Sequence, residues 1–181
     1  MKRDDVWAIV KRTAPLYEFD PLLFLALCEQ ESIDPDEPTI YRDRAARLEQ
    51  GFYVNYTEKE DFATTTEVLY ATSYGLTQML GESLDHVGYF DWWFSLQTPM
   101  SQAFLQSAKQ DIAVVKAINE YMTHPEWQIE RGCMWLKKKQ KLAGSDTTKM
   151  LRLWNGDISG AHHYAENVLA RKAKLATIYK V

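Results

Sequence analysis

The chain has 181 residues, of which 46% are hydrophobic and 13% aromatic, and its formal net charge is −4. This length suits a single domain, and the composition is typical of a folded globular protein and argues against a disordered chain. The negative charge argues against nucleic-acid binding, and no apolar run in the sequence approaches the roughly eighteen residues that span a membrane.

The N-terminal residues, MKRDDVWAIVKRTAP, differ from a secretory signal. Asp4 and Asp5 follow the basic start, and Lys11 and Arg12 interrupt the apolar part. We therefore expect the protein to be made in a cytoplasm without a signal peptide.

Helical periodicity dominates the chain. The sequence predicts a first short helix that ends near residue 13. Further helices are predicted, in chain order, over 21–32, 111–122, 126–142, 150–154 and 162–179. Residues 33–74 are less regular, and there we expect two short helices, over 42–50 and 60–70, and at most a small β-hairpin over 51–56. The fold class is therefore mostly α, with a single domain over residues 1–181 in which 33–74 is an irregular, cleft-forming insertion.

The cysteines and histidines do not suggest a metal or redox site. Cys28 and Cys133 lie in predicted helices among apolar neighbours, which favours two buried thiols over a disulfide. The four histidines lack the spacing of metal ligands. We expect no metal and no cofactor.

The segment DPLLFLALCEQESIDP, residues 20–35, predicts a buried helix that ends on a carboxylate. Asp20 is a good N-cap, Pro21 suits the first helical position, and an Asp-Pro pair ends the helix. Glu29 and Glu31 lie near the negative end of the helix dipole in apolar surroundings, and both effects raise the pKa of a carboxyl group. A glutamic acid there can stay protonated near neutral pH and act as a proton donor, although such a residue is also commonly a solvated surface charge.

Three later segments carry polar side chains suited to a sugar-binding cleft. SYGLTQML contains Gln78, LRLWNGD contains Asn155 before a turn glycine, and HHYAENVLARKAKL contains Tyr164. Planar amides bind sugar hydroxyls, and a tyrosine hydroxyl can orient an acid. The alternative is that Gln78 and Asn155 are cap and turn residues and Tyr164 is a core tyrosine.

The order and wording of these segments resemble the superfamily of soluble lytic transglycosylases and goose-type lysozymes. In that superfamily a helix ends in Glu-Ser. It is followed along the chain by Gly-Leu-Met-Gln, then by Tyr-Asn-Gly, and then by a tyrosine before a closing helix. The segments AARLEQGFYVNYT, GESLDHVGYF and IERGCMWLKKKQKL are similar to stretches of bacteriophage members. The resemblance extends over nearly the whole of residues 20–175.

The resemblance implies roles for single residues. Glu31 matches the catalytic acid, whereas Glu29, about 200° round the helix, faces elsewhere. Residues that match substrate-binding positions are Ser32, Gln78, Trp154, Asn155 and Tyr164. Glu49 is a candidate second acidic residue of the cleft, or a group paired with an arginine. Thr77 and Trp154 depart from the family pattern, which has methionine and tyrosine at these positions.

The activity that the resemblance implies is cleavage of the β-1,4 bond between N-acetylmuramic acid and N-acetylglucosamine in peptidoglycan. Glu31 would protonate the glycosidic oxygen and then, as a carboxylate, accept the proton of the muramoyl C6 hydroxyl, giving a 1,6-anhydro product. This scheme needs no second enzyme carboxylate, unlike most glycoside hydrolysis. Two alternatives remain: a muramidase that uses water with an acidic residue of 33–74 as base, and a non-catalytic virion or wall-binding protein.

The expected partner is the glycan strand of peptidoglycan, bound by a monomer, with no nucleic acid and no membrane. As a bacteriophage protein, the chain would be made in the host cytoplasm. It would act in the bacterial cell wall or periplasm, either as an endolysin at host lysis or as a component of the virion.

Overall fold

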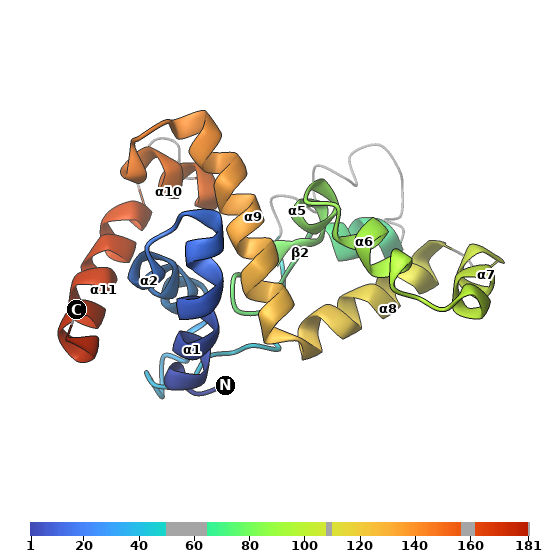
Figure 1. Cartoon of the computed structure of the whole chain (residues 1–181), viewed down its shortest axis with the longest axis horizontal. Coiled ribbons are helices and arrows are strands. Elements are labelled where there is room, and N and C mark those ends of the chain that lie inside the picture. Colours follow the sequence, from blue (N-terminus) through green and yellow to red (C-terminus); the bar gives the residue numbers. More distant parts are fainter. Residues whose placement is uncertain (50–64, 108–109, 157–161, 181) are drawn as a thin grey trace. The chain divides into compact units, whose positions relative to one another are not determined.

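The computed structural model describes residues 1–49, 65–107, 110–156 and 162–180. In these ranges the chain is mostly helical and contains a small three-stranded antiparallel sheet (Figure 1), which confirms the prediction of a mostly α protein. The chain divides into two compact units. Residues 1–42 and 129–181 form unit 1, and residues 43–128 form unit 2. The assignment of residues 1–181 to one catalytic domain stays a prediction.

Unit 1 is helical and is organised around one apolar helix. Its described elements are α1 (Arg3–Thr13), the 3-10 helix η1 (Ala14–Tyr17), α2 (Pro21–Ser32), most of α9 (Pro125–Ala143), α10 (Thr147–Asn155) and α11 (Tyr164–Tyr179). Helices α1 and α11 pack against α2, and α10 packs against α11 (Figure 1). Residues 22–29 of α2 each expose 7% of their surface or less, so the predicted buried helix is the core of this unit.

Both ends of α2 lie where the sequence predicts them. The Asp20 carboxylate accepts a hydrogen bond from the backbone N–H of Leu22 (2.8 Å), and Pro21 occupies the first helical position. At the other end Ile33 adopts an extended conformation. The backbone N–H of Asp34 then donates to the carbonyl of Ile40 (2.8 Å), so a short loop returns beside the helix end.

Unit 2 combines the sheet with short helices. Its described elements are β1 (Ala46–Leu48), α4 (Thr65–Tyr70), β2 (Thr72–Tyr74), β3 (Met79–Leu80), α5 (Gly81–His86), α6 (Tyr89–Ser95), α7 (Pro99–Ser107), α8 (Gln110–Thr123) and the first turn of α9. The strand order is β1-β2-β3, with Arg47 opposite Ser73 and Ser73 opposite Leu80. Ser73 therefore lies at the centre of the sheet.

The core of unit 2 is aromatic. Tyr89 and Trp93 are buried, and each polar tip has a partner on α8. The Tyr89 hydroxyl donates to the carbonyl of Ala117 (2.7 Å), and the Trp93 indole N–H donates to the carboxylate of Glu120 (2.7 Å). These two hydrogen bonds join α6 to α8, since a buried tyrosine or tryptophan needs a partner for its polar atom.

The predicted helix over 42–50 is wrong, because residues 46–48 form strand β1. This segment is rich in good helix formers, but its backbone pairs with β2, and tertiary pairing outweighs a weak local propensity. The predicted hairpin over 51–56 lies outside the described residues. Helix α4 covers the described part of the helix predicted over 60–70.

The other predicted helices are confirmed to within three residues at each end. The largest difference is at α10, which begins at Thr147 rather than Met150. Asp146 explains the earlier start, since its carboxylate accepts a hydrogen bond from the backbone N–H of Lys149 (2.9 Å) and so caps the helix.

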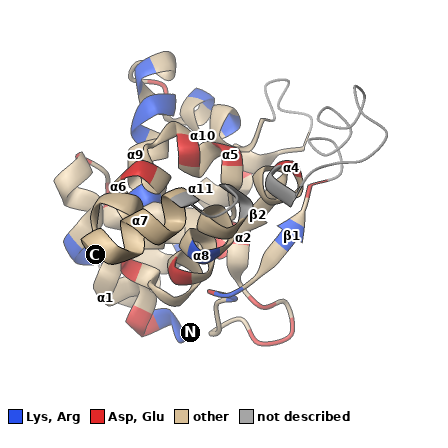
Figure 2. Ribbon diagram, turned by 90° about the vertical axis from the view of Figure 1, so that its right-hand side faces the viewer, with Lys and Arg blue, Asp and Glu red and all other residues tan. Residues whose placement is uncertain are grey.

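Helix α7 has no charged residue in its described length (Figure 2). Met100 and Phe104, one turn apart, expose 83% and 62% of their surface, so they form an apolar stripe on the surface of unit 2. None of the helices in the described ranges is both long and apolar enough to cross a membrane.

Candidate active site

Glu31, the penultimate residue of α2, accepts two hydrogen bonds on one carboxylate oxygen. The indole N–H of Trp154 donates to Oε1 (3.0 Å), and the hydroxyl of Tyr164 donates to the same atom. Trp154 lies in the last turn of α10, and Tyr164 is the first residue of α11. Three of the segments that the sequence singles out therefore meet at one half-buried carboxylate inside unit 1.

The ends of α10 and α11 are arranged so that both donors reach this carboxylate. Gly156, with φ of +80°, ends α10 in the left-handed conformation that glycine adopts most readily. Beyond that turn, α11 begins at Tyr164. An ion pair between Arg152 of α10 and Glu166 of α11 (2.7 Å) joins the two helices close to the site.

The surroundings of Tyr164 keep its hydroxyl protonated. Tyr164 is 5% exposed. Burial, and next the negative charge of Glu31 and the hydrogen bond to it, raise the pKa of Tyr164 well above its ordinary value of 10. The hydroxyl therefore remains a hydrogen-bond donor throughout the neutral pH range.

This geometry assigns different roles to the two oxygens of Glu31. An indole N–H can only donate, so Oε1 is the acceptor of the bond from Trp154. The carbonyl oxygen of a neutral carboxyl group is its acceptor. A proton carried on Oε2 is compatible with the hydrogen bonds of Trp154 and Tyr164 to Oε1.

Glu29 faces away from this cluster, as the helical spacing predicts. Its carboxylate is buried and lies 2.8 Å from Nε of Arg3 and 3.8 Å from Nη1 of Arg171. Glu29 is thus a buried carboxylate between two arginines, and its surroundings differ from those of Glu31.

The other two predicted site residues of unit 1 are Ser32, which follows Glu31, and Asn155 on α10. Ser32 is buried, and its hydroxyl donates to the carbonyl of Cys28 one turn earlier (2.8 Å), so the side chain is turned onto its own helix. Asn155 is the last residue of α10 and is exposed. Their roles in substrate binding stay predictions.

Gln78 and Glu49, the remaining predicted residues, belong to unit 2 and meet at the central strand of its sheet. The Ser73 hydroxyl lies 2.7 Å from Oε1 of Glu49 and 3.1 Å from Oε1 of Gln78. Glu49 also pairs with the guanidinium of Arg47 (2.8 Å). Glu49 is therefore paired with an arginine, which is one of the two roles expected for it.

Gln128 is a residue that the sequence analysis missed. It is fully buried at the start of α9, and its amide oxygen accepts from the backbone N–H of Leu76 (2.8 Å). Its amide nitrogen donates to the carbonyls of Tyr121 and Asp43 (3.1 Å each). Gln128 thus anchors the turn that presents Gln78. No signal in the sequence separates this glutamine from a solvated residue on an amphipathic helix.

The two cysteines are buried free thiols, as predicted. Burial raises the pKa of Cys28 well above its ordinary value, so a reactive thiolate is not formed there. Within the described part of the chain, no three side chains of histidine, cysteine, aspartate or glutamate are grouped so that they could hold a metal ion.

Comparisons with protein-family models, with curated proteins and with solved structures give no match to this chain.

Proposed function

We propose that this chain is a peptidoglycan lytic transglycosylase with a lysozyme-like fold and that Glu31 is its catalytic acid. The observation that supports the proposal most directly is the pair of donors on Oε1 of Glu31, one from Trp154 and one from Tyr164. The resemblance of four ordered segments to the transglycosylase superfamily supports it independently. The substrate is the bond between N-acetylmuramic acid and N-acetylglucosamine in a glycan strand.

In the first step, the proton on Oε2 of Glu31 moves to the glycosidic oxygen while the bond from that oxygen to C1 of the muramoyl residue breaks. Positive charge develops on the sugar ring, and Glu31 becomes a carboxylate. Trp154 and Tyr164 stabilise this carboxylate through Oε1, because their hydrogen bonds strengthen when the acceptor becomes an anion.

In the second step, the Glu31 carboxylate accepts the proton of the muramoyl C6 hydroxyl. The C6 oxygen of the sugar then forms a bond to C1 of the same residue. The product is a 1,6-anhydro sugar, Glu31 regains its proton, and no water is consumed. One carboxyl group thus acts as acid and then as base.

Mass spectrometry of digested walls tests the reaction type. We expect muropeptides that end in anhydro-muramic acid, lighter by one water than the corresponding reducing sugars. Reducing ends formed from the first turnover onward would contradict the transglycosylase and identify a muramidase. Walls that bind the protein but stay intact would instead favour a wall-binding role without catalysis.

Replacing either donor to Glu31 is expected to slow the reaction. Tyr164→Phe should lower kcat by about 10- to 100-fold, since a hydrogen bond to a charged group contributes about 1.5–3 kcal/mol. Trp154→Phe removes a donor on the same oxygen and should lower kcat as well, with a smaller effect on KM. The measurement is the initial rate of soluble product release from purified walls.

Tyr179→Phe is the matched control for these variants. It makes the same change near the other end of α11, where the tyrosine hydroxyl contacts Asp4 (3.1 Å). This control should keep the rate of the wild type. Full activity of Tyr164→Phe would show that the hydroxyl has no part in the reaction.

A further inference from the structure

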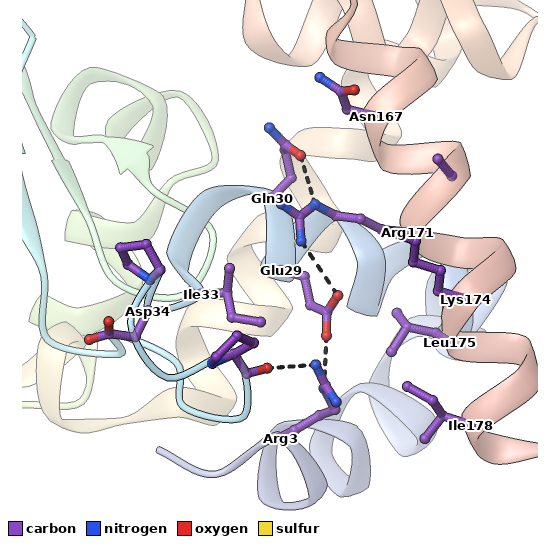
Figure 3. A pocket seen from close by; sticks show the side chains of 13 residues that line it. Arg3, Glu29, Gln30, Ile33, Asp34, Asn167, Arg171, Lys174, Leu175 and Ile178 are labelled. Carbon is purple, nitrogen blue, oxygen red and sulfur yellow. Dashed lines mark hydrogen bonds and ion pairs between the residues drawn. The ribbon is translucent and has the colours of Figure 1, made fainter.

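The last turn of α2 is held by side chains from the helices around it. Glu29, Gln30 and Glu31 follow one another in sequence, and α11 contacts all three. Tyr164 donates to Glu31. Nε of Arg171 donates to the amide oxygen of Gln30 (2.9 Å), and Nη1 of Arg171 lies 3.8 Å from Glu29 (Figure 3). A single arginine thus contacts the two residues that precede the proposed acid.

Glu29 is a buried carboxylate that Arg171 helps to neutralise. Its side chain is 6% exposed at the C-terminal end of α2, where the helix dipole disfavours an anion. A buried carboxylate needs a cation and hydrogen bonds to offset its desolvation. Arg3 supplies one cation and also donates to the carbonyl of Pro38 (2.6 Å), and Arg171 supplies the second.

Tyr164 and Arg171 lie on the same face of α11, because a separation of seven residues is close to two helical turns. This face packs against α2. A helix held to its neighbour at two points two turns apart has a fixed rotation and a fixed axial position. The contacts of Arg171 therefore set the place from which the Tyr164 hydroxyl reaches Glu31.

We propose that Arg171 is a positioning residue of this site: it fixes α11 on the last turn of α2 so that Tyr164 meets Oε1 of Glu31. This inference rests on the proposed function only where activity is the readout. Arg171 borders an open groove of about 590 Å³ between this turn and α11 (Figure 3), and its side chain is 36% exposed. A shorter side chain would leave space filled by water, so substitution should not collapse the core.

The kinetic test compares Arg171→Gln and Arg171→Lys with the wild type on purified walls. We expect Arg171→Gln to lower kcat about tenfold with little change in KM, since it misplaces Tyr164 without touching substrate. Arg171→Lys keeps the charge near Glu29 and should recover part of the rate. In a Tyr164→Phe background, Arg171→Gln should cause little further loss, because its effect acts through the missing hydroxyl.

Lys174→Gln is the control, since Lys174 lies on the same helix, is exposed and borders the same groove. It should leave kcat unchanged.

A second readout does not depend on activity. The NMR signal of the ring carbon bonded to the Tyr164 hydroxyl, labelled with ¹³C, should shift in Arg171→Gln but not in Lys174→Gln. A wild type that leaves walls intact would overturn the proposed function alone, and the NMR comparison would still decide the role of Arg171. An unchanged Tyr164 signal in Arg171→Gln would overturn the positioning role.

Discussion

Glu31→Gln is expected to lower the rate of wall cleavage by about 10³-fold or more, to the limit of detection, while the protein remains folded. An amide has the shape of the carboxyl group but no acidic proton that it could transfer to the substrate. Its oxygen can still accept from Trp154 and Tyr164, so the cluster at the end of α2 stays intact. The measurement is the fall in turbidity of purified walls, together with the thermal unfolding midpoint.

Two further glutamates make this experiment specific. Glu18→Gln changes a carboxylate whose side chain is 81% exposed and paired with Lys137, and it should leave the rate unchanged. Glu49→Gln should reduce the rate only a few-fold if one carboxyl group serves as both acid and base. A loss with Glu49→Gln as large as that with Glu31→Gln would contradict the single-acid mechanism and point to a hydrolase with two carboxylates.

Gly75→Ala is expected to destabilise the protein, lowering the free energy of unfolding by about 2–4 kcal/mol. Gly75 has a φ of +71°, which is unfavourable for alanine. A β-carbon there would lie 2.4 Å from Oε1 of Gln128. That oxygen accepts from the N–H of Leu76, so the added methyl group would displace a buried hydrogen-bonded amide. Urea unfolding of the full chain, followed by circular dichroism, measures the change.

Gly88→Ala separates the two causes. Gly88 also belongs to unit 2 and has nearly the same φ, +68°, but no atom lies within 4 Å of the added β-carbon. This variant should lose only the backbone contribution, about 1–2 kcal/mol. Equal losses in the two glycine variants would mean that the contact with Gln128 contributes nothing.

Local signals were sufficient to predict α2 from the sequence. Asp20, Pro21 and an unbroken apolar run define a start and a buried interior whichever partners surround the helix. Strand β1 is different, since its three side chains are exposed and its residues favour a helix. Its conformation depends on pairing with β2, more than twenty residues away in sequence, and no local pattern contains that information.

The residues of the candidate site also divide into those that could be predicted and those that depend on contacts between distant parts of the chain. Glu31 and Tyr164 could be predicted from the resemblance, and the structure places them in contact. Trp154 was expected as a substrate-binding residue, but its hydrogen bond to Glu31 depends on how α10 ends beside α2. Arg171 and Gln128 were missed, because a charged or amide side chain on an amphipathic helix has no local mark of burial or of a distant partner.

The composition of unit 1 from two separate stretches of chain has a consequence for folding. Glu31 and Tyr164 are 133 positions apart, and all of unit 2 lies between them in sequence. During synthesis Glu31 therefore leaves the ribosome long before Trp154 and Tyr164. Closing so long a loop costs entropy and slows folding relative to local helix formation. A chain interrupted before α11 would contain Glu31 without the hydroxyl that orients it, so the site is assembled only when synthesis has passed through both units.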